Sequence, residues 1–524
     1  MRISEDFPAK TTSFAIGILS LGTETLWVRT FSFLGRSTPI AVSTILGTYL
    51  LGIAFGAVVG ARLCRTQDKE KLIESLTMSL LAGSAVILVS PLILVAMEKG
   101  TTGHGNDSIL SQAITALCLA FLPAFIFSIC FPICHHLGTK LESGKIGKGM
   151  SRVYAANISG SVVGPLLVNF VILQFATTEL AFAILGILGV SVAALLPSYA
   201  DPRRGLKMAS AACFVFGVAN LIALVRSDNW LIRSLAADTI PKHDILRVIE
   251  TRQGIIVSYK DETLGDEIYG GNVYDGRTNL SPRLNSNGIN RILVTAALRP
   301  NPKKVLEIGL SVGSWNYLIS GFPGVEQIDV VEINPGYLQL MDDYPKQMGV
   351  MNDPRIRLHI GDGRKFLRTI PEGTYDLVVM NTTWHWRAYV SLLLSKEFLT
   401  LVRSRMAPGG LFAFNTTWSS DALYTAASVF PHAYLYDNFA ICADFDWRAA
   451  LEKPESVREL MKVRPEKTPL FTNDDSAIAE AFLSRRHTAT VDELAAKIGR
   501  PLEIITDRNL LTEYKYGRSI RPRD

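Results

Sequence analysis

The residues best suited to hold a small ligand follow an apolar run at 305–308, where two glycines stand close together. Gly309 and Gly313 let the backbone approach a ligand, and a helix that begins behind such a loop offers it free N–H groups. The middle glycine of a GxGxxG pattern is replaced here by Ser311. Taken alone, the loop is therefore equally consistent with a tight strand–helix turn.

Two acidic residues at the ends of the next two predicted strands favour a nucleoside site. Glu332 follows Gly309 at about the 20-residue separation from which a carboxylate reaches ribose hydroxyls. Asp362, followed by Gly363, ends the third strand, where an aspartate can accept a hydrogen bond from an adenine amino group. No Lys or Arg follows the loop to bind a phosphate, so the pattern argues for an adenosyl sulfonium rather than a dinucleotide.

A polar and aromatic segment, Asn-Thr-Thr-Trp-His-Trp-Arg at 381–387, follows the fourth strand, and ligands bind at such strand ends in α/β sheets. Asn381 begins it, His385 is a candidate general base with an ordinary pKa near ~6.5, and Arg387 can pair with a carboxylate or phosphate. The alternative is a loop that packs on the sheet with Arg387 touching solvent or lipid headgroups.

These segments need a sheet to bring them together, and the pattern from about residue 245 predicts one. Short β-rich runs alternate with amphipathic stretches, which indicates an α/β Rossmann-like domain of the methyltransferase type with a parallel sheet. A small β-rich lead-in occupies 245–280, and a polar tail with two helices occupies 450–524. The predicted strands are 245–250, 255–259 and 267–274 in the lead-in, then 304–309, 327–333, 357–360, 375–380 and 411–415.

The chain before residue 227 has a different character. Of all 524 residues 48% are hydrophobic and only 19% are charged, and most of the apolar excess lies in this part. Segments of about 20 apolar residues, long enough to cross a bilayer, predict a polytopic α-helical domain over 1–226 with about seven spans. A charged linker at 227–244 is expected to lie at the membrane interface. The spans are 12–34, 39–61, 75–97, 109–134, 153–174, 178–197 and 208–226.

Basic residues in three connections between the spans bear on orientation. The positive-inside rule makes these connections cytoplasmic, which would place the domain after the last span outside, away from the adenosyl sulfonium compounds of the cytoplasm. A domain that binds an adenosyl sulfonium is instead expected in the cytoplasm, where such compounds are found. We expect the whole chain to be an integral protein of a bacterial inner membrane. The basic residues are Arg62, Arg65, Lys69 and Lys71, then Lys140, Lys145, Lys148 and Arg152, then Arg203, Arg204 and Lys207.

Four other features of the sequence give weaker evidence about function. The net charge of +5 is too small to indicate a nucleic-acid partner. Glu24 lies in a predicted span, where it is equally open to a functional or a structural role. The spacing of Gly52, Gly56 and Gly60 predicts close helix packing. Cys and His residues near 130–136 lack the spacing of a metal site, and no metal is expected.

Several of these segments resemble the spermidine synthase (polyamine aminopropyltransferase) family. In the lead-in, 272–276 together with Asn279 is similar to that family's LDGxxQ segment. The motif Glu-Thr-Leu-Trp-Val-Arg at 24–29, the glycines of 52–60 and the tail at 505–514 resemble its membrane-fused branch. The core similarity is carried by 305–313, 330–335, 353–355, 361–364 and 408–410.

The resemblance implies transfer of an aminopropyl group from decarboxylated S-adenosylmethionine to an amine, with release of methylthioadenosine. It implies that Asp275 lies near the acceptor and that the co-substrate is held without a metal. The acceptor would be a small molecule, membrane lipids would surround the first domain, and the protein would form a homodimer. The implied co-substrate residues are Gly309, Ser311, Gly313, Glu332, Asp362, Gly363 and Asn279.

The sequence departs from the family where the amine should bind. Where the family has an aspartate after the first glycines, this chain has Val312. Where the family has the segment DSxDP, this chain has Asn-Thr-Thr-Trp at 381–384, so both aspartates of that segment are absent. Asn381, His385, Arg387 and Asp275 become the catalytic candidates. An arginine in this place favours a donor or acceptor with an anionic group, such as S-adenosylmethionine itself or an anionic amine or lipid, over a polyamine.

Two other classes of function stay open. The chain is alternatively a nucleoside-binding sensor without activity, or a transport or lipid-handling module regulated by its second half.

Overall fold

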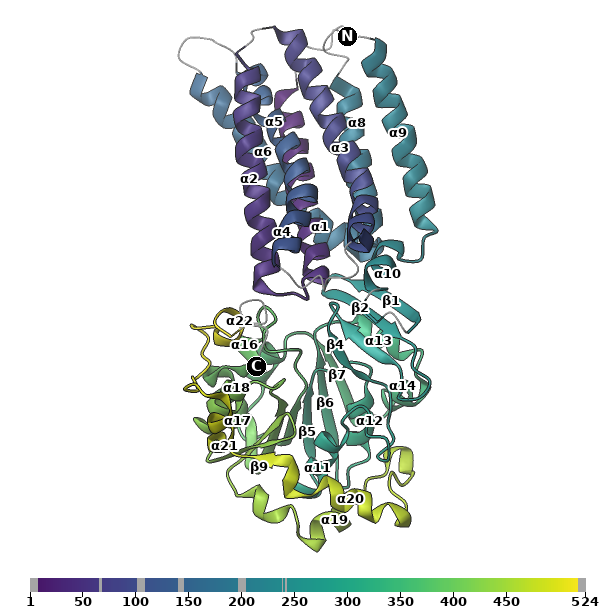
Figure 1. Ribbon diagram of the computed structural model, residues 1–524, viewed down its shortest axis with the longest axis vertical. Helices are drawn as coiled ribbons and strands as arrows, with labels where there is room; N and C mark the ends of the chain where they lie inside the picture. The colour runs from purple at the N-terminus through teal and green to yellow at the C-terminus, as the bar shows by residue number, and fades with distance from the viewer. Residues whose placement is uncertain are drawn as a thin grey trace. The chain divides into compact units, whose positions relative to one another are not determined.

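The chain folds into two compact units, Met1–Pro241 and Lys242–Asp524 (Figure 1). The structure is a computed structural model and describes residues 8–65, 68–100, 109–139, 146–196, 204–237, 239–240 and 243–516. Lys140, Lys145 and Arg203 of the basic connections lie outside these ranges, as do residues 517–524 of the expected tail.

The described part of the first unit is helical, and Figure 1 shows its long helices side by side. A π-helical segment, Val168–Ile172, joins two of them. The helices are α1 (Ala9–Leu34), α2 (Pro39–Leu63), α3 (Lys69–Gly100), α4 (Ile109–Leu119), α5 (Phe121–Gly138), α6 (Ile146–Leu167), α7 (Leu173–Phe175), α8 (Thr178–Leu195), α9 (Arg204–Val225) and α10 (Trp230–Ala236).

Six stretches among the described residues are long and apolar enough to cross a membrane, one fewer than the sequence predicts. The first expected span does form a helix, α1, but it is not among the six. Its many hydroxyl side chains, together with Glu24 and Arg29, make it less apolar than the others. The six are Pro39–Leu63, Lys69–Lys99, Ala113–Gly138, Met150–Phe175, Thr178–Leu195 and Leu206–Val225.

The glycines of α2 allow close contact with α5, as their spacing predicts. A Cβ at Gly56 would lie 2.1 Å from the carbonyl oxygen of Phe125, and one at Gly60 would lie 2.4 Å from that of Ile129. Only glycine lets the two backbones pack at this distance.

The second unit begins with an antiparallel sheet in the order β1-β2-β3-β4. The predicted strand 267–274 is two strands, because Gly271 and Asn272 both adopt positive φ and turn the chain back on itself. Their bounds are β1 (Ile245–Thr251), β2 (Gly254–Tyr259), β3 (Glu267–Gly270) and β4 (Tyr274–Arg277).

The main sheet has the order β12-β10-β11-β9-β8-β5-β6-β7. The predicted parallel strands are present, but the sheet is mixed, because β10 and β11 form an antiparallel hairpin beside β9 and β12 pairs with β10. The strands are β5 (Lys304–Ile308), β6 (Gln327–Glu332), β7 (Ile356–Ile360), β8 (Tyr375–Met380), β9 (Met406–Asn415), β10 (His432–Tyr436), β11 (Phe439–Ala443) and β12 (Thr488–Ala489).

Apolar cores cover both faces of this sheet. Consecutive residues of β5 point to opposite sides, so that Val305 belongs to one core and Leu306 to the other. Leu318 of α12 packs in the first core and Phe398 of α17 in the second. The helices are α11 (Asn290–Leu298), α12 (Ser314–Ser320), α13 (Gly336–Met341), α14 (Pro345–Val350), α15 (Gly363–Thr369), α16 (Ser391–Leu394), α17 (Lys396–Arg405) and α18 (Ser420–Ala427).

The polar tail packs against this domain. Its described helices are α19 (Pro454–Leu460), α20 (Ser476–Phe482), α21 (Val491–Ile498) and α22 (Leu511–Tyr514). Asp507 forms a two-pronged ion pair with Arg364 at 2.5 and 2.8 Å and accepts a hydrogen bond from Ser395 at 2.7 Å. Two motifs that lie far apart in the sequence, 361–364 and 505–514, are therefore joined by one contact.

Candidate functional site

The loop from β5 to α12 has a backbone shape that favours small residues. Gly309 has φ +90° and Gly313 has φ +72°. A Cβ at Gly309 would lie 2.4 Å from the carbonyl oxygen of Asn381, so the loops after β5 and β8 pack closely there. Ser311 also has a positive φ, +49°, and its buried hydroxyl has no hydrogen-bond partner among the described residues. A hydroxyl left free in this position fits a ligand-binding loop.

Glu332 holds this loop in place from the end of β6. Its Oε2 accepts a hydrogen bond from the Leu310 amide and its Oε1 accepts one from the Asn334 amide, both at 2.8 Å. Burial raises the pKa of Glu332 to about 7, and the amide hydrogen bonds oppose that rise. Glu332 lines neither of the pockets described below, so its observed contacts are with the loop backbone.

A second buried carboxylate, Glu307, lies in β5 and was not found from the sequence. It accepts a hydrogen bond from Asn316 Nδ2 at 2.9 Å, while its Oε1 has no partner among the described residues. Burial raises the pKa of Glu307 to about 8, and the neighbouring Glu332 adds to the rise. Two acids with raised pKa values thus lie behind the glycine loop.

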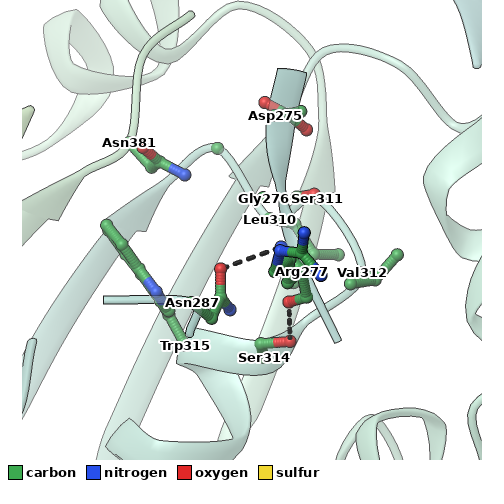
Figure 2. A pocket seen from close by; sticks show the side chains of 11 residues that line it. Asp275, Gly276, Arg277, Asn287, Leu310, Ser311, Val312, Ser314, Trp315 and Asn381 are labelled. Carbon is green, nitrogen blue, oxygen red and sulfur yellow. Dashed lines mark hydrogen bonds between the residues drawn. The ribbon is translucent and has the colours of Figure 1, made fainter. Parts of the chain in front are cut away.

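A pocket with an empty volume of about 260 Å³ lies between the glycine loop and the lead-in sheet (Figure 2). Asn287 Oδ1 accepts a hydrogen bond from the Arg277 amide at 2.9 Å, and Ser314 donates to the Arg277 carbonyl at 3.2 Å. These bonds hold β4 beside α12. Besides residues 309–312 of the loop, its lining includes Asp275, Gly276, Arg277, Asn287, Ser314, Trp315 and Asn381.

A larger pocket, with an empty volume of about 690 Å³, shares part of this lining. Asp275 and Asn381 border both pockets, which makes the two spaces neighbours. Among the described residues, Asp275 is the one acid that lines either pocket. The larger pocket also has Gly276, Asn287 and Trp315 in common with the smaller, and adds Tyr274, Arg291, Thr382, Trp384, Asn415, Thr417, Trp418 and Asn438.

Asp275 is coupled to two buried side chains. Burial, together with the nearby Asp275 carboxylate, raises the pKa of Tyr337. Burial lowers the pKa of Arg387, while attraction to Tyr337 and Asp275 opposes the change. The carboxylate therefore lies within the field of a buried guanidinium.

Arg387 and His385 line neither pocket. Arg387 Nη1 donates to the Thr383 hydroxyl at 2.6 Å and to the Gly270 carbonyl at 3.1 Å, which ties the loop after β8 to the lead-in sheet. His385 Nδ1 lies 3.0 Å from the hydroxyl of Thr417. In this structure both predicted catalytic residues hold loops in position.

The other predicted co-substrate residues have local structural contacts. Asp362 is exposed and caps α15, with its Oδ1 accepting from the Lys365 amide at 2.8 Å. Gly363 lets that helix approach β5, because a Cβ there would lie 2.7 Å from Ile308 Cγ2. Asn279 closes a turn by accepting from the Ser281 amide at 2.9 Å. Neither pocket includes them.

Sequence reasoning missed Arg291, the basic residue of the larger pocket. It lies in the first turn of α11, where no motif marks it, and its guanidinium lies 5.0 Å from the ring centroid of Phe439 and 5.5 Å from that of Trp315. Burial lowers the pKa of Arg291 to about 10, which leaves it charged at neutral pH. The only available signal was an arginine at the start of an otherwise apolar helix.

One group of residues in the described part of the chain has the spacing of a metal site. Ligand atoms of His243, Asp261 and Glu267 lie within 4.8 Å of one another. Both acids form ion pairs with Arg277, the one to Asp261 at 2.6 Å. These pairs already account for the carboxylates, so we assign the group no metal.

Comparisons with known proteins agree with the resemblance seen in the sequence. Residues 292–431 match the model of the spermine/spermidine synthase domain. Spermidine synthase 2 of Hyoscyamus niger is 37% identical over 113 residues, which cover 21% of this chain and 36% of that protein. Spermine synthase of Arabidopsis thaliana is 35% identical over 112 residues, covering 21% of this chain and 31% of that protein. The chain thus spans about a third of the length of the curated relatives it matches.

Among solved structures, spermidine synthase from Thermotoga maritima aligns with a TM-score of 0.38 and 19% identity, covering 49% of this chain and 87% of that one. A spermidine synthase in complex with the transition-state analogue AdoDATO aligns with a TM-score of 0.39 and 19% identity, covering 49% and 88%. From the matched domain and its relatives, the C-terminal half of this chain contains a spermidine synthase domain, fused to an N-terminal helical region.

Proposed function

We propose that the second unit is an aminopropyltransferase-like enzyme that uses an adenosyl sulfonium donor and releases methylthioadenosine. The donor is decarboxylated S-adenosylmethionine or S-adenosylmethionine itself. The observation that carries the proposal is the position of the two neighbouring pockets, which share Asp275 and Asn381 beside the glycine loop at Gly309. One pocket suits the donor chain next to the loop, and the other suits an acceptor.

In this reaction the lone pair of an acceptor nitrogen forms a bond to the carbon next to the sulfonium sulfur. The carbon–sulfur bond breaks, its electron pair stays on sulfur, and methylthioadenosine leaves as a neutral thioether. The acceptor nitrogen loses one proton, for which the Asp275 carboxylate is the candidate acceptor. Most of the rate enhancement would come from holding donor and nucleophile in line.

For the whole chain we propose an integral protein of a bacterial inner membrane, with the second unit on the cytoplasmic side. The six apolar helices support a membrane location. The cytoplasmic side is proposed because adenosyl donors are found there. The acceptor is a small molecule, either a polyamine or an amine with an anionic group, and membrane lipids surround the first unit. A homodimer belongs to the same proposal, and the size of the full chain in detergent tests it.

The test is mass spectrometry of the nucleosides released when the purified full chain, in detergent, is incubated with each donor and a set of amines. We expect methylthioadenosine, and we expect Asp275→Asn to reduce its formation at least 100-fold. Asp444→Asn, an exposed aspartate paired with Arg403, is the matched control and should leave the rate unchanged.

Three other results would change the proposal. S-adenosylhomocysteine as the product would indicate methyl transfer. Binding of methylthioadenosine without turnover on any amine would favour the nucleoside sensor, which the loss of both acids at 381–384 makes the second candidate. No binding of any adenosyl compound would exclude both.

A further inference from the structure

The larger pocket is lined by a positively charged side chain, Arg291, whereas a site for a polyamine needs carboxylates. The guanidinium of Arg291 donates to the Gly288 carbonyl at 2.8 Å, the Asn287 carbonyl at 3.0 Å and Asn438 Oδ1 at 2.8 Å. All three acceptors are neutral, and no ion pair of Arg291 is found among the described residues. Three contacts use three of the five N–H groups of the side chain.

Arg277, which lines the smaller pocket, differs in this respect. It forms ion pairs with Asp261 and Glu267, so its charge is already balanced inside the lead-in sheet. Of the two arginines that line the pockets, Arg291 is therefore the one without an ion pair among the described residues. The Asp437 carboxylate attracts Arg291 from beyond ion-pair distance. Asp437 itself accepts from Asn290 Nδ2 at 2.7 Å and lies 2.8 Å from His487 Nδ1, so the guanidinium keeps N–H groups for a ligand.

A series of side-chain hydrogen bonds links Arg291 to Asn381 through the amides of Asn438 and Asn415. Asn438 Nδ2 donates to Asn415 Oδ1 at 2.9 Å, and Asn415 Nδ2 donates to Asn381 Oδ1 at 3.1 Å. The orientation of Asn415 is determined independently, because its Oδ1 also accepts the backbone amide of Thr417 at 2.8 Å, and that amide can only donate.

The oxygen of Asn381 thus accepts from Asn415 and keeps one lone pair, while its NH₂ group is left as a donor. Figure 2 shows the nitrogen of Asn381 turned toward the middle of the smaller pocket, which Asp275 also lines. The family's catalytic segment has an aspartate at the corresponding place, which would present an acceptor to an ammonium group. Here the same position presents two N–H donors and no negative charge, which favours a carboxylate over an ammonium.

We propose that these pockets bind the carboxylate of a substrate through Arg291 and the Asn381 amide, with the substrate's ammonium on the side of Asp275. The substrate class is then an amino-acid-like zwitterion and not a plain polyamine. The proposal rests on the proposed function and specifies its substrate. The carboxylate belongs either to the donor, as in S-adenosylmethionine, or to the acceptor.

Ligand pairs that differ by one carboxylate test the proposal. Calorimetry on the full chain in detergent would compare S-adenosylmethionine with its decarboxylated form, and ornithine with putrescine in the presence of methylthioadenosine. We expect the carboxylated member of at least one pair to bind about tenfold tighter or more, as for a charge-assisted hydrogen bond. The pair that shows the preference identifies the source of the carboxylate. Equal or weaker binding of the carboxylated member in both pairs would overturn the proposal.

Variants separate recognition from folding. Arg291→Gln should remove the preference for the carboxylated member, whereas Arg291→Lys should keep part of that preference. Asn381→Asp should shift the preference toward the decarboxylated member. Arg299→Gln, at the C-terminal end of α11, is the control. It removes an ion pair with Asp376 that lies outside the pocket linings, so it should leave the preference between the ligands unchanged. A wild-type preference that Arg291→Gln and Asn381→Asp both leave intact would also overturn the proposal.

Methylthioadenosine, which has neither the aminoalkyl chain nor a carboxylate, separates this inference from the proposed function. If the wild-type chain does not bind it, the proposed function fails. If it binds and neither ligand pair shows a preference for the carboxylate, the zwitterion proposal fails alone.

Discussion

The carboxylate of Glu332 accepts a hydrogen bond from the backbone amide of Leu310, with 2.8 Å between Oε2 and the nitrogen. The end of β6 therefore controls the shape of the loop after β5. In the sequence Glu332 was a ribose-binding candidate, and the structure shows that it also positions the loop that would surround the ligand. Each carboxylate oxygen has a second lone pair, so both roles are compatible.

Replacing Glu332 should weaken nucleoside binding. Glu332→Gln has one acceptor oxygen in place of two, so either Leu310 or Asn334 loses its partner. Hydrogen bonds to charged groups contribute about 1.5–3 kcal/mol, and we expect the affinity for methylthioadenosine to fall about tenfold or more. Calorimetry measures it, with the exposed Glu326→Gln as control. An unchanged affinity would show that the loop keeps its shape without this carboxylate.

The buried Glu307 should make stability depend on pH. In the folded chain it keeps its proton up to about pH 8, compared with 4.5 for the ordinary group, so between these values the folded state binds more protons than the unfolded state. Stability then falls as pH rises from about 4.5 to about 8. Glu307→Gln cannot ionise and should melt at a higher temperature than the wild type at pH 8, and at a similar temperature at pH 5.

The measurement is the melting temperature of the full chain in detergent at pH 5, 6, 7 and 8. Glu332, whose pKa is raised to about 7, contributes in the same direction, so the variant should reduce the slope without removing it. A slope identical to that of the wild type would contradict the assignment to Glu307.

Gly309 should tolerate no side chain. Gly309→Ala meets both an unfavourable φ of +90° and a Cβ 2.4 Å from the Asn381 carbonyl oxygen. Gly373→Ala is the matched control, because its φ is +66° and nothing lies within 4 Å. The control should lose about 1–2 kcal/mol from backbone strain alone. We expect Gly309→Ala to lose more stability than the control and also to lose methylthioadenosine binding, as seen by melting and calorimetry.

Helix packing in the first unit should depend on Gly56. A Cβ there would lie 2.1 Å from the Phe125 carbonyl oxygen, so Gly56→Ala must push α2 and α5 apart and lower the melting temperature. Gly47 lies on the same helix with nothing within 4 Å. Gly47→Ala should be neutral or slightly stabilising, since alanine is the better helix former by up to about 1 kcal/mol. Equal effects of the two variants would refute close packing at Gly56.

The side of the second unit can be measured with a reporter fused after residue 524. We expect the reporter to be active only as a cytoplasmic fusion, because the adenosyl donors are cytoplasmic. A second fusion in the basic connection between α2 and α3 is the internal comparison. Activity of the C-terminal reporter only outside the cytoplasm would instead support the positive-inside rule and another ligand.

Local patterns were sufficient for much of the architecture. The strand ending at Ile308, the glycine turn at Gly309 and the strand ending before Asn381 all follow from apolar runs and their boundaries. The hairpin β10–β11 was missed, because its apolar residues read equally well as part of a helix. The split of 267–274 into two strands depends on positive φ at Asn272, which its residue type permits without requiring.

The sequence by itself determined that an apolar helical half precedes an α/β half, and it predicts a loop and two acids suited to a nucleoside. Both are properties of short segments. Only the tertiary structure decided which residues line the pockets. Arg291, Asn415 and Asn438 lie far apart along the chain, and the order of strands in the sheet brings them to Asn381. Arg387 lies in the segment where a catalytic residue was expected, but its guanidinium holds the loop after β8. Contacts between elements, and not spacing in the sequence, decide where a side chain points.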